Sequence, residues 1–173
     1  MGAKRRGLAK VQAKLQSLKR ELQFKQSTLV GYKKKLKTLT AGTGHVLTAA
    51  DSGSTVMFTA AGATTVTLPT PELGLHYTFV TNIQATGNHI IKCKLDTQGF
   101  VGGLTLSAQT VNKDQAFLAG GGTNDIITMD GDTKGGAPGS RIECIAVSAT
   151  QWAVTGVVLS DGTEVATPFS DGS

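Results

Sequence analysis

Residues 55–69 read TVMFTAAGATTVTLP, which contains two short runs of apolar residues and threonines on either side of a glycine-containing turn. Alternation of apolar and polar residues with period two is typical of a β-strand with one buried face. The same pattern recurs along the chain, in the runs 77–80, 89–95, 126–129, 141–147 and 152–158. Turn signals rich in Gly, Pro and Asp separate these runs, and residues 45–160 contain no pattern of a long helix. We therefore predict a mainly β domain at residues 45–160, built as an antiparallel sandwich or a barrel-like fold.

The length of 173 residues suits one such domain plus an appendage. The AGTG sequence at residues 41–44 has the composition of a helix stop and a linker. Residues 161–173 are predicted to form an extended C-terminal tail.

The apolar residues within residues 1–40 have a different spacing. Apolar residues recur there in alternating steps of three and four, the heptad pattern of a coiled coil, which only Lys25 interrupts. The predicted seam consists of Leu8, Val11, Leu15, Leu18, Leu22, Leu29, Tyr32, Leu36 and Leu39. A helix over residues 4–39 would be about 54 Å long, so most of its seam needs another helix or a partner's groove for cover.

Charge divides the chain at the same place. Residues 1–40 carry twelve Lys and Arg and one acid, 12 − 1 = +11, whereas the remainder carries 5 − 11 = −6. Such an arm attracts an anionic surface. The residues predicted to bind this partner are Lys4, Arg5, Arg6, Lys10, Lys14, Lys19, Arg20, Lys33, Lys34 and Lys35.

The β region also resembles a known group of proteins. Residues 45–55 (HVLTAADSGST) and 59–69 (TAAGATTVTLP), with 135–144 (GGAPGSRIEC) and 151–156 (QWAVTG), are similar to a pattern in tailed-phage structural proteins that decorate capsids or form head or tail fibres. The resemblance implies a virion-exposed, trimeric β domain without a cofactor. The basic arm is not part of the matched pattern, so its attachment role rests on its own residues.

Few residues indicate a catalytic or metal-binding site. The three histidines, His45, His76 and His89, lack the spacing of a zinc site. Asp130-Gly131-Asp132 fits an Asp-Gly turn, with a calcium site as the alternative, although it lacks the closing Glu of an EF-hand loop. No phosphate-binding loop or nucleophile elbow is present in the sequence. We expect no enzymatic activity, no cofactor and no metal.

Two cysteines, Cys93 and Cys144, each share a strand face with apolar neighbours. This placement predicts buried free thiols, with a bridge between the two strands as the alternative. No apolar run reaches the about 18 residues of a membrane span, and no apolar region of a secretory signal follows the first basic residues.

These observations favour a capsid decoration (cement) protein, made in the host cytoplasm, whose basic arm binds the major capsid protein or another virion protein on the capsid exterior. The alternative is a tail or head fibre or spike subunit, with a coiled stalk and a receptor-facing β domain. A third hypothesis is an internal virion protein whose arm binds nucleic acid. Binding to a membrane surface is disfavoured, because the seam has heptad spacing rather than a broad apolar face.

Overall fold

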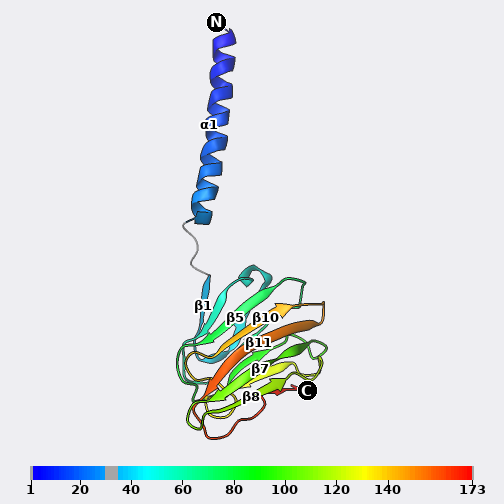
Figure 1. Cartoon of the computed structure of the whole chain (residues 1–173). Coiled ribbons are helices and arrows are strands. Elements are labelled where there is room, and N and C mark those ends of the chain that lie inside the picture. Colours follow the sequence, from blue (N-terminus) through cyan, green and yellow to red (C-terminus); the bar gives the residue numbers. More distant parts are fainter. Residues whose placement is uncertain (1, 30–34, 173) are drawn as a thin grey trace. The chain divides into compact units, whose positions relative to one another are not determined.

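The computed structural model of the chain describes residues 2–29 and 35–172. The chain divides into two compact units, Met1–Lys34 and Lys35–Ser173 (Figure 1). In its described residues the first unit contains one helix, α1 (Gly2–Leu29). The described part of the second unit is a β domain with a short 3-10 helix, η1 (Ala49–Asp51), and these strands: β1 (Leu36–Leu39), β2 (Gly42–Val46), β3 (Thr55–Phe58), β4 (Thr64–Thr67), β5 (His76–Thr81), β6 (His89–Lys92), β7 (Gly99–Ala108), β8 (Lys113–Leu118), β9 (Ile126–Met129), β10 (Arg141–Ala146), β11 (Gln151–Ser160) and β12 (Phe169–Ser170).

The helix is shorter than the sequence predicts. The prediction extends it to residue 39, but α1 ends at Leu29 and residues 36–39 form strand β1, so the helical prediction is wrong for this last part. A strand sends residues three apart to opposite faces. Leu36 is therefore 55% exposed, whereas Leu39 is completely buried in the core of the β domain. Burial of Leu39 in that core outweighs the weak local preference for a helix.

Residues 30–34, which include the predicted seam residue Tyr32 and the predicted binding residues Lys33 and Lys34, lie outside the described residues. The predicted linker, residues 41–44, overlaps strand β2. The β domain thus starts at Lys35, ten residues earlier than predicted.

The β domain consists of two mixed sheets, so the prediction of a purely antiparallel domain is wrong. The seven-stranded sheet has the order β1-β3-β5-β10-β11-β7-β8, and the five-stranded sheet has the order β12-β9-β6-β4-β2. Neighbours among β1, β3 and β5 are parallel, as are neighbours among β2, β4 and β6. The strands beyond β6 pair antiparallel, except that β11 and β7 are parallel.

The parallel pairs arise because the first six strands alternate between the sheets. Each coil of chain adds one strand to each sheet, so successive strands within a sheet run in the same direction. Leu36 pairs with Thr55, and Thr55 pairs with Thr78, which gives coils of 55 − 36 = 19 and 78 − 55 = 23 residues. Residues 35–92 therefore form a short two-sheet coil, and the remaining strands complete both sheets.

The hydrophobic core lies between the two sheets. Strands β3 and β10 bury every second residue, as expected for strands with one covered face. Phe58 of the larger sheet stacks on His89 of the smaller sheet with ring centroids 4.6 Å apart, which shows that the sheets meet face to face. Tyr77 and Trp152, whose ring centroids are 5.7 Å apart, are among the largest fully buried side chains.

Two further sequence predictions concern this core and the tail. Cys93 and Cys144 are both buried and both free, which confirms the prediction of buried free thiols. In the C-terminal tail, β12 pairs with β9 and Phe169 is only 6% exposed.

Candidate partner-binding site

Helix α1 carries an exposed apolar stripe. Val11, Leu15, Leu18 and Leu22 follow one another at steps of four, three and four, which places them on one face of a helix. Their residues are 57%, 52%, 51% and 58% exposed. Four consecutive seam positions are thus more than half uncovered, and the stripe is a surface to which a partner can bind.

Basic side chains flank the stripe. Lys14 precedes Leu15 and Lys19 follows Leu18, so both lie directly beside the stripe, and both are exposed. Lys10 and Arg20 are also exposed but lie farther round the same helix. The first unit carries 10 − 1 = +9, whereas the β domain from residue 35 onward carries 7 − 11 = −4. An apolar stripe bordered by cations suits a partner whose apolar groove has an anionic rim, because burial and charge attraction then act together.

The structure divides the other predicted residues into two groups. Lys4, Arg5, Arg6, Leu8 and Leu29 lie within α1 by their backbone, and their side chains are outside the description. The second group was predicted to be part of the arm but belongs to the β domain, and consists of Lys35, Leu36 and Leu39. The assignment of Lys35 to the arm is wrong, because its side chain binds within the domain.

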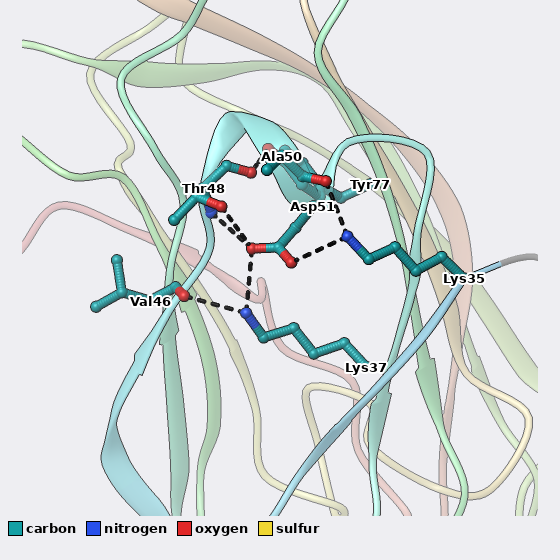
Figure 2. A network of polar contacts seen from close by, with 7 residues as sticks. All are labelled: Lys35, Lys37, Val46, Thr48, Ala50, Asp51 and Tyr77. Carbon is teal, nitrogen blue, oxygen red and sulfur yellow. Dashed lines mark hydrogen bonds and ion pairs between the residues drawn. The ribbon is translucent and has the colours of Figure 1, made fainter.

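Lys35 is part of a polar network around Asp51 at the start of the β domain (Figure 2). The Lys37 ammonium lies 3.1 Å from Asp51 Oδ2, and the Lys35 ammonium lies 3.6 Å from Asp51 Oδ1. The backbone N–H and the hydroxyl of Thr48 both donate to Asp51 Oδ2, at 2.9 and 2.8 Å. Both lysines also donate to backbone carbonyls, Lys35 to Ala50 at 2.9 Å and Lys37 to Val46 at 3.3 Å.

The electrostatics of this network favour the ionised carboxylate. Burial raises the pKa of Asp51, but hydrogen bonds from Thr48 and Lys37 and the charge of Lys37 outweigh burial and lower it to about 2. The Tyr77 hydroxyl donates to the Thr48 carbonyl at 2.8 Å. Burial, reinforced by the negative charges of Asp51 and Glu72, raises the pKa of Tyr77 to about 12. The network thus ties β1 to the turn after β2 and to β5.

The sequence analysis missed this network, although one signal was present. Thr48 and Asp51 have the spacing of a helix N-terminal capping motif, in which the side chain three positions after the capping residue accepts from the backbone N–H of that residue. That spacing predicts the local turn. The two lysines come from a strand that the sequence does not reveal.

The Asp and His side chains that were considered as metal ligands have structural roles. Asp130 accepts hydrogen bonds from the backbone N–H groups of Asp132, Thr133 and Lys134 and from the Thr133 hydroxyl, as an Asp-Gly turn requires. His89 lies in the core, where burial lowers its pKa, against the opposing effect of backbone carbonyl partners at Ala60 and Gly62. Among the described residues, no group of three or more His, Cys, Asp or Glu side chains is arranged to hold a metal ion.

In the part of the chain that the structure describes, no helix is long and apolar enough to cross a membrane. No protein-family model, no curated protein and no solved structure matches the chain.

Proposed function

We propose that this chain is a structural, non-enzymatic protein of a tailed-phage virion, a capsid decoration protein that binds the capsid exterior through α1. The observation that carries this proposal is the apolar stripe of α1, exposed along four seam positions and flanked by basic side chains. The phage-like pattern of the β region supports the choice of a virion. The partner is the major capsid protein or another virion protein with an acidic, grooved surface.

The division of charge supports an attachment role for α1 rather than for the β domain. A surface that attracts the arm, at +9, repels the β domain, at −4. The domain is then held away from the partner surface and faces outward. Association through the arm weakens with added salt, because solvent-exposed charge pairs are screened.

The apolar stripe alone provides modest affinity. Each of its four side chains is about half exposed, and burying the rest of a Leu or Val side chain contributes about 1 kcal/mol. Four such contributions give at most about 4 kcal/mol, so the stripe alone supports a dissociation constant no tighter than about 1 mM, before the entropic cost of association. Stable attachment therefore also needs the basic side chains or several arms per assembly, which fits the trimer implied by the phage resemblance.

A binding assay with capsids that lack this protein tests the proposal. The apolar variant Leu15→Gln/Leu18→Gln and the charge variant Lys14→Gln/Lys19→Gln should both lose cosedimentation with these capsids. Lys92 and Lys94 are exposed on the β domain, so Lys92→Gln/Lys94→Gln is a control with the same loss of charge and should bind normally. Equal binding by the wild type and both α1 variants would refute attachment through α1.

A fibre or spike subunit is the second candidate. The observation that favours it is the two-sheet coil of residues 35–92, because coils of this kind extend by repetition in elongated β proteins. Cryo-electron microscopy of the virion separates the candidates by location. Copies over the whole capsid surface indicate decoration, whereas a few copies at one vertex indicate a fibre.

Nucleic-acid binding by the arm is a further outcome of the same experiments. A gel shift with the full-length chain, competed by the capsids, compares the two anionic partners directly. If DNA displaces the protein from capsids at stoichiometric amounts, the internal nucleic-acid role replaces the decoration role.

A further inference from the structure

Strand β8 forms one edge of the seven-stranded sheet, at the end opposite β1 (Figure 1). It pairs antiparallel with β7, and the Ala119 backbone N–H, directly after β8, donates to the Gly102 carbonyl at 3.0 Å. In an antiparallel ladder, residues that bond to the neighbouring strand alternate with residues whose N–H and C=O point away from it. Counting back from Ala119, the residues that point away are Leu118, Ala116 and Asp114. The edge therefore offers the N–H and C=O groups of these residues to an added strand.

The described remainder of the chain does not pair with this edge. The C-terminal tail runs elsewhere, because the backbone N–H groups of residues 161, 162 and 166 donate to the carbonyls of residues 131–133. Helix α1 cannot supply a paired strand wherever the first unit lies, because the backbone hydrogen bonds of a helix run within the helix. The backbone groups of the β8 edge are thus open to an extended segment from another molecule.

The other sheet edges are shorter or are capped by side chains. Strand β12 contains two residues. The Lys37 ammonium donates to the Val46 carbonyl of β2 at 3.3 Å, and the His45 ring nitrogen Nε2 lies 2.8 Å from the Thr40 carbonyl oxygen after β1. Short edges and edge lysines are devices by which proteins prevent strand addition. Strand β8 has six residues, and within the described residues no side chain bonds to its backbone, so this edge lacks both devices.

The side chains of β8 specify what can be added. Leu118 is 78% exposed and lies opposite Gly103 of β7, so β7 offers it no side chain to pack against. A strand on the free side would provide this neighbour. Asp114 is exposed and has no ion pair within the described residues, whereas the adjacent Lys113 pairs with Glu164 at 3.2 Å. An added strand is therefore favoured if it has an apolar residue beside Leu118 and a basic residue beside Asp114.

A second copy of β8 does not meet this requirement. Two copies that meet at the same edge around a two-fold axis pair antiparallel. The one register that pairs all the outward-pointing residues with each other is centred on Ala116. It places Asp114 opposite Leu118, which sets a carboxylate against an apolar side chain instead of a cation.

We propose that the β8 edge binds an extended segment of another protein, which adds a strand to the seven-stranded sheet. This segment has a basic residue beside Asp114 and an apolar residue beside Leu118, and the β domain, at −4, attracts its charge. Main-chain hydrogen bonds provide the affinity and the alternate side chains provide the specificity. Capsid binding by α1 does not enter this inference, and the two contacts are measured separately.

Fluorescence anisotropy of the labelled synthetic peptide TVTVTKT, with the full-length chain, tests the proposal. Paired antiparallel to β8, the peptide places its valines beside Leu118 and Ala116 and its lysine beside Asp114. We expect saturable binding with a dissociation constant below about 1 mM. Methylation of the backbone nitrogen of the second valine removes a donor that faces β8 and should weaken binding at least about tenfold. Methylation at the threonine between the valines removes an N–H that faces away and should change binding little.

Variants of the chain locate the binding site. Ala116→Pro removes the central outward N–H; proline is tolerated where an edge N–H faces solvent, so the domain should fold and bind the peptide at least about tenfold more weakly. Ala116→Thr keeps this N–H and suits a strand, so it is the matched control and should bind normally. Asp114→Lys should reverse the charge preference and bind the peptide TVTVTET about two- to fivefold more tightly than TVTVTKT. Fluorescence of the buried Trp152 verifies that each variant is folded.

The proposal is overturned if the wild type shows no saturable binding of TVTVTKT, or if folded Ala116→Pro binds it as tightly as the wild type. Where Ala116→Pro does not fold, Asp114→Lys decides, and an unchanged charge preference contradicts the proposal. Light scattering that shows an oligomer of the wild type and a monomer of folded Ala116→Pro would assign the edge to a second copy instead. A chain that cosediments with capsids but does not bind the peptide refutes the β8 site and leaves attachment through α1 intact.

Discussion

Replacing Asp51 by Asn should destabilise the β domain at neutral pH and leave it unaffected in strong acid. The Asp51 side chain is 15% exposed and accepts from Thr48 and Lys37, with Lys35 beside it. The pKa of Asp51 is about 2 in the folded chain, against an ordinary value of 3.8. At about 1.4 kcal/mol per unit, this difference corresponds to at most about 2.4 kcal/mol.

Solvent around the two lysines screens part of this interaction, because both ammonium groups are partly exposed. We therefore expect Asp51→Asn to lower the free energy of unfolding by about 1–2 kcal/mol at pH 7. The folded pKa is lowered, so the stabilisation is fully present above the unfolded value of 3.8 and is lost as pH falls through about 2. The wild type and the variant should then converge between about pH 5 and pH 2.

Urea unfolding measures this difference through the one tryptophan of the chain, Trp152, which is completely buried. Protein concentration is kept equal, since self-association adds to stability. Asp96 is an exposed acid, and Asp96→Asn is the matched control with the same chemical change. A difference below about 0.3 kcal/mol at pH 7, or one that persists undiminished at about pH 2, would refute the assignment.

Three further outcomes are expected. Leu39→Ala should cost about 2–5 kcal/mol in urea unfolding, because Leu39 is completely buried, whereas Leu36→Ala should cost less than about 1 kcal/mol; equal effects would contradict strand β1. Gly131→Ala should lower the melting temperature by several degrees, because Gly131 has φ +85° and an added Cβ would lie 2.0 Å from a backbone oxygen; an unchanged temperature would contradict this close contact. Burial raises the pKa of Cys93 to about 12 and that of Cys144 further still, so both thiols should resist alkylation at pH 8 until urea unfolds the chain, and rapid labelling of the folded protein would contradict their burial.

The sequence predicts the strands whose period is clear. The seven runs with apolar residues on one side correspond to β3, β4, β5, β6, β9, β10 and β11. In most of these strands the buried residues alternate, as in Arg141–Ala146, so the pattern is visible without the structure. Strand β5 is an exception, because Thr78 is buried between Tyr77 and Phe79.

The remaining strands lack that signal for identifiable reasons. Strand β8 (Lys113–Leu118) is almost entirely exposed, so neither of its faces is marked by apolar residues. Strand β2 (Gly42–Val46) has the composition of a turn, and pairing with β4 overrides its weak local preference. Strand β1 was missed because its two leucines, Leu36 and Leu39, are three positions apart and therefore continue the heptad spacing of the arm.

The alternation of apolar and polar residues also does not predict the direction of a strand. Period-two alternation gives the buried face of a strand but does not say which strand lies beside it. The early strands are joined by connections that cross from one sheet to the other, as between Phe58 and Thr64, rather than by two-residue hairpin turns. Parallel pairing follows from these crossings, and only the three-dimensional structure reveals them.

The Asp51 network shows the same limit for the candidate site. The turn at Asp51 has a capping motif in the sequence. If residues 36–39 are predicted as helix, however, Lys35 and Lys37 belong to the basic arm and no contact with Asp51 is expected. Reassigning them lowers the charge of the arm from +11 over residues 1–40 to +9 over residues 1–34. This reassignment does not change the exposed stripe from Val11 to Leu22. Partner binding by the arm therefore remains a prediction, and it now concerns α1.

The affinity of one α1 and the number of copies in an assembly together determine how strongly the protein attaches. One apolar stripe offers about 4 kcal/mol, which by itself holds a monomer at only about millimolar concentration. When copies associate, as in the trimer that the phage resemblance implies, a second α1 binds the same partner surface as an intramolecular event. An effective concentration of about 1 mM divided by a dissociation constant of about 1 mM gives a gain near 1, so a second arm that binds by its apolar stripe alone adds little to the overall affinity. The basic side chains must therefore strengthen each arm before several arms can act together. If they lower the single-arm dissociation constant to about 10 μM, each added arm raises the overall affinity about 10²-fold without any new contact.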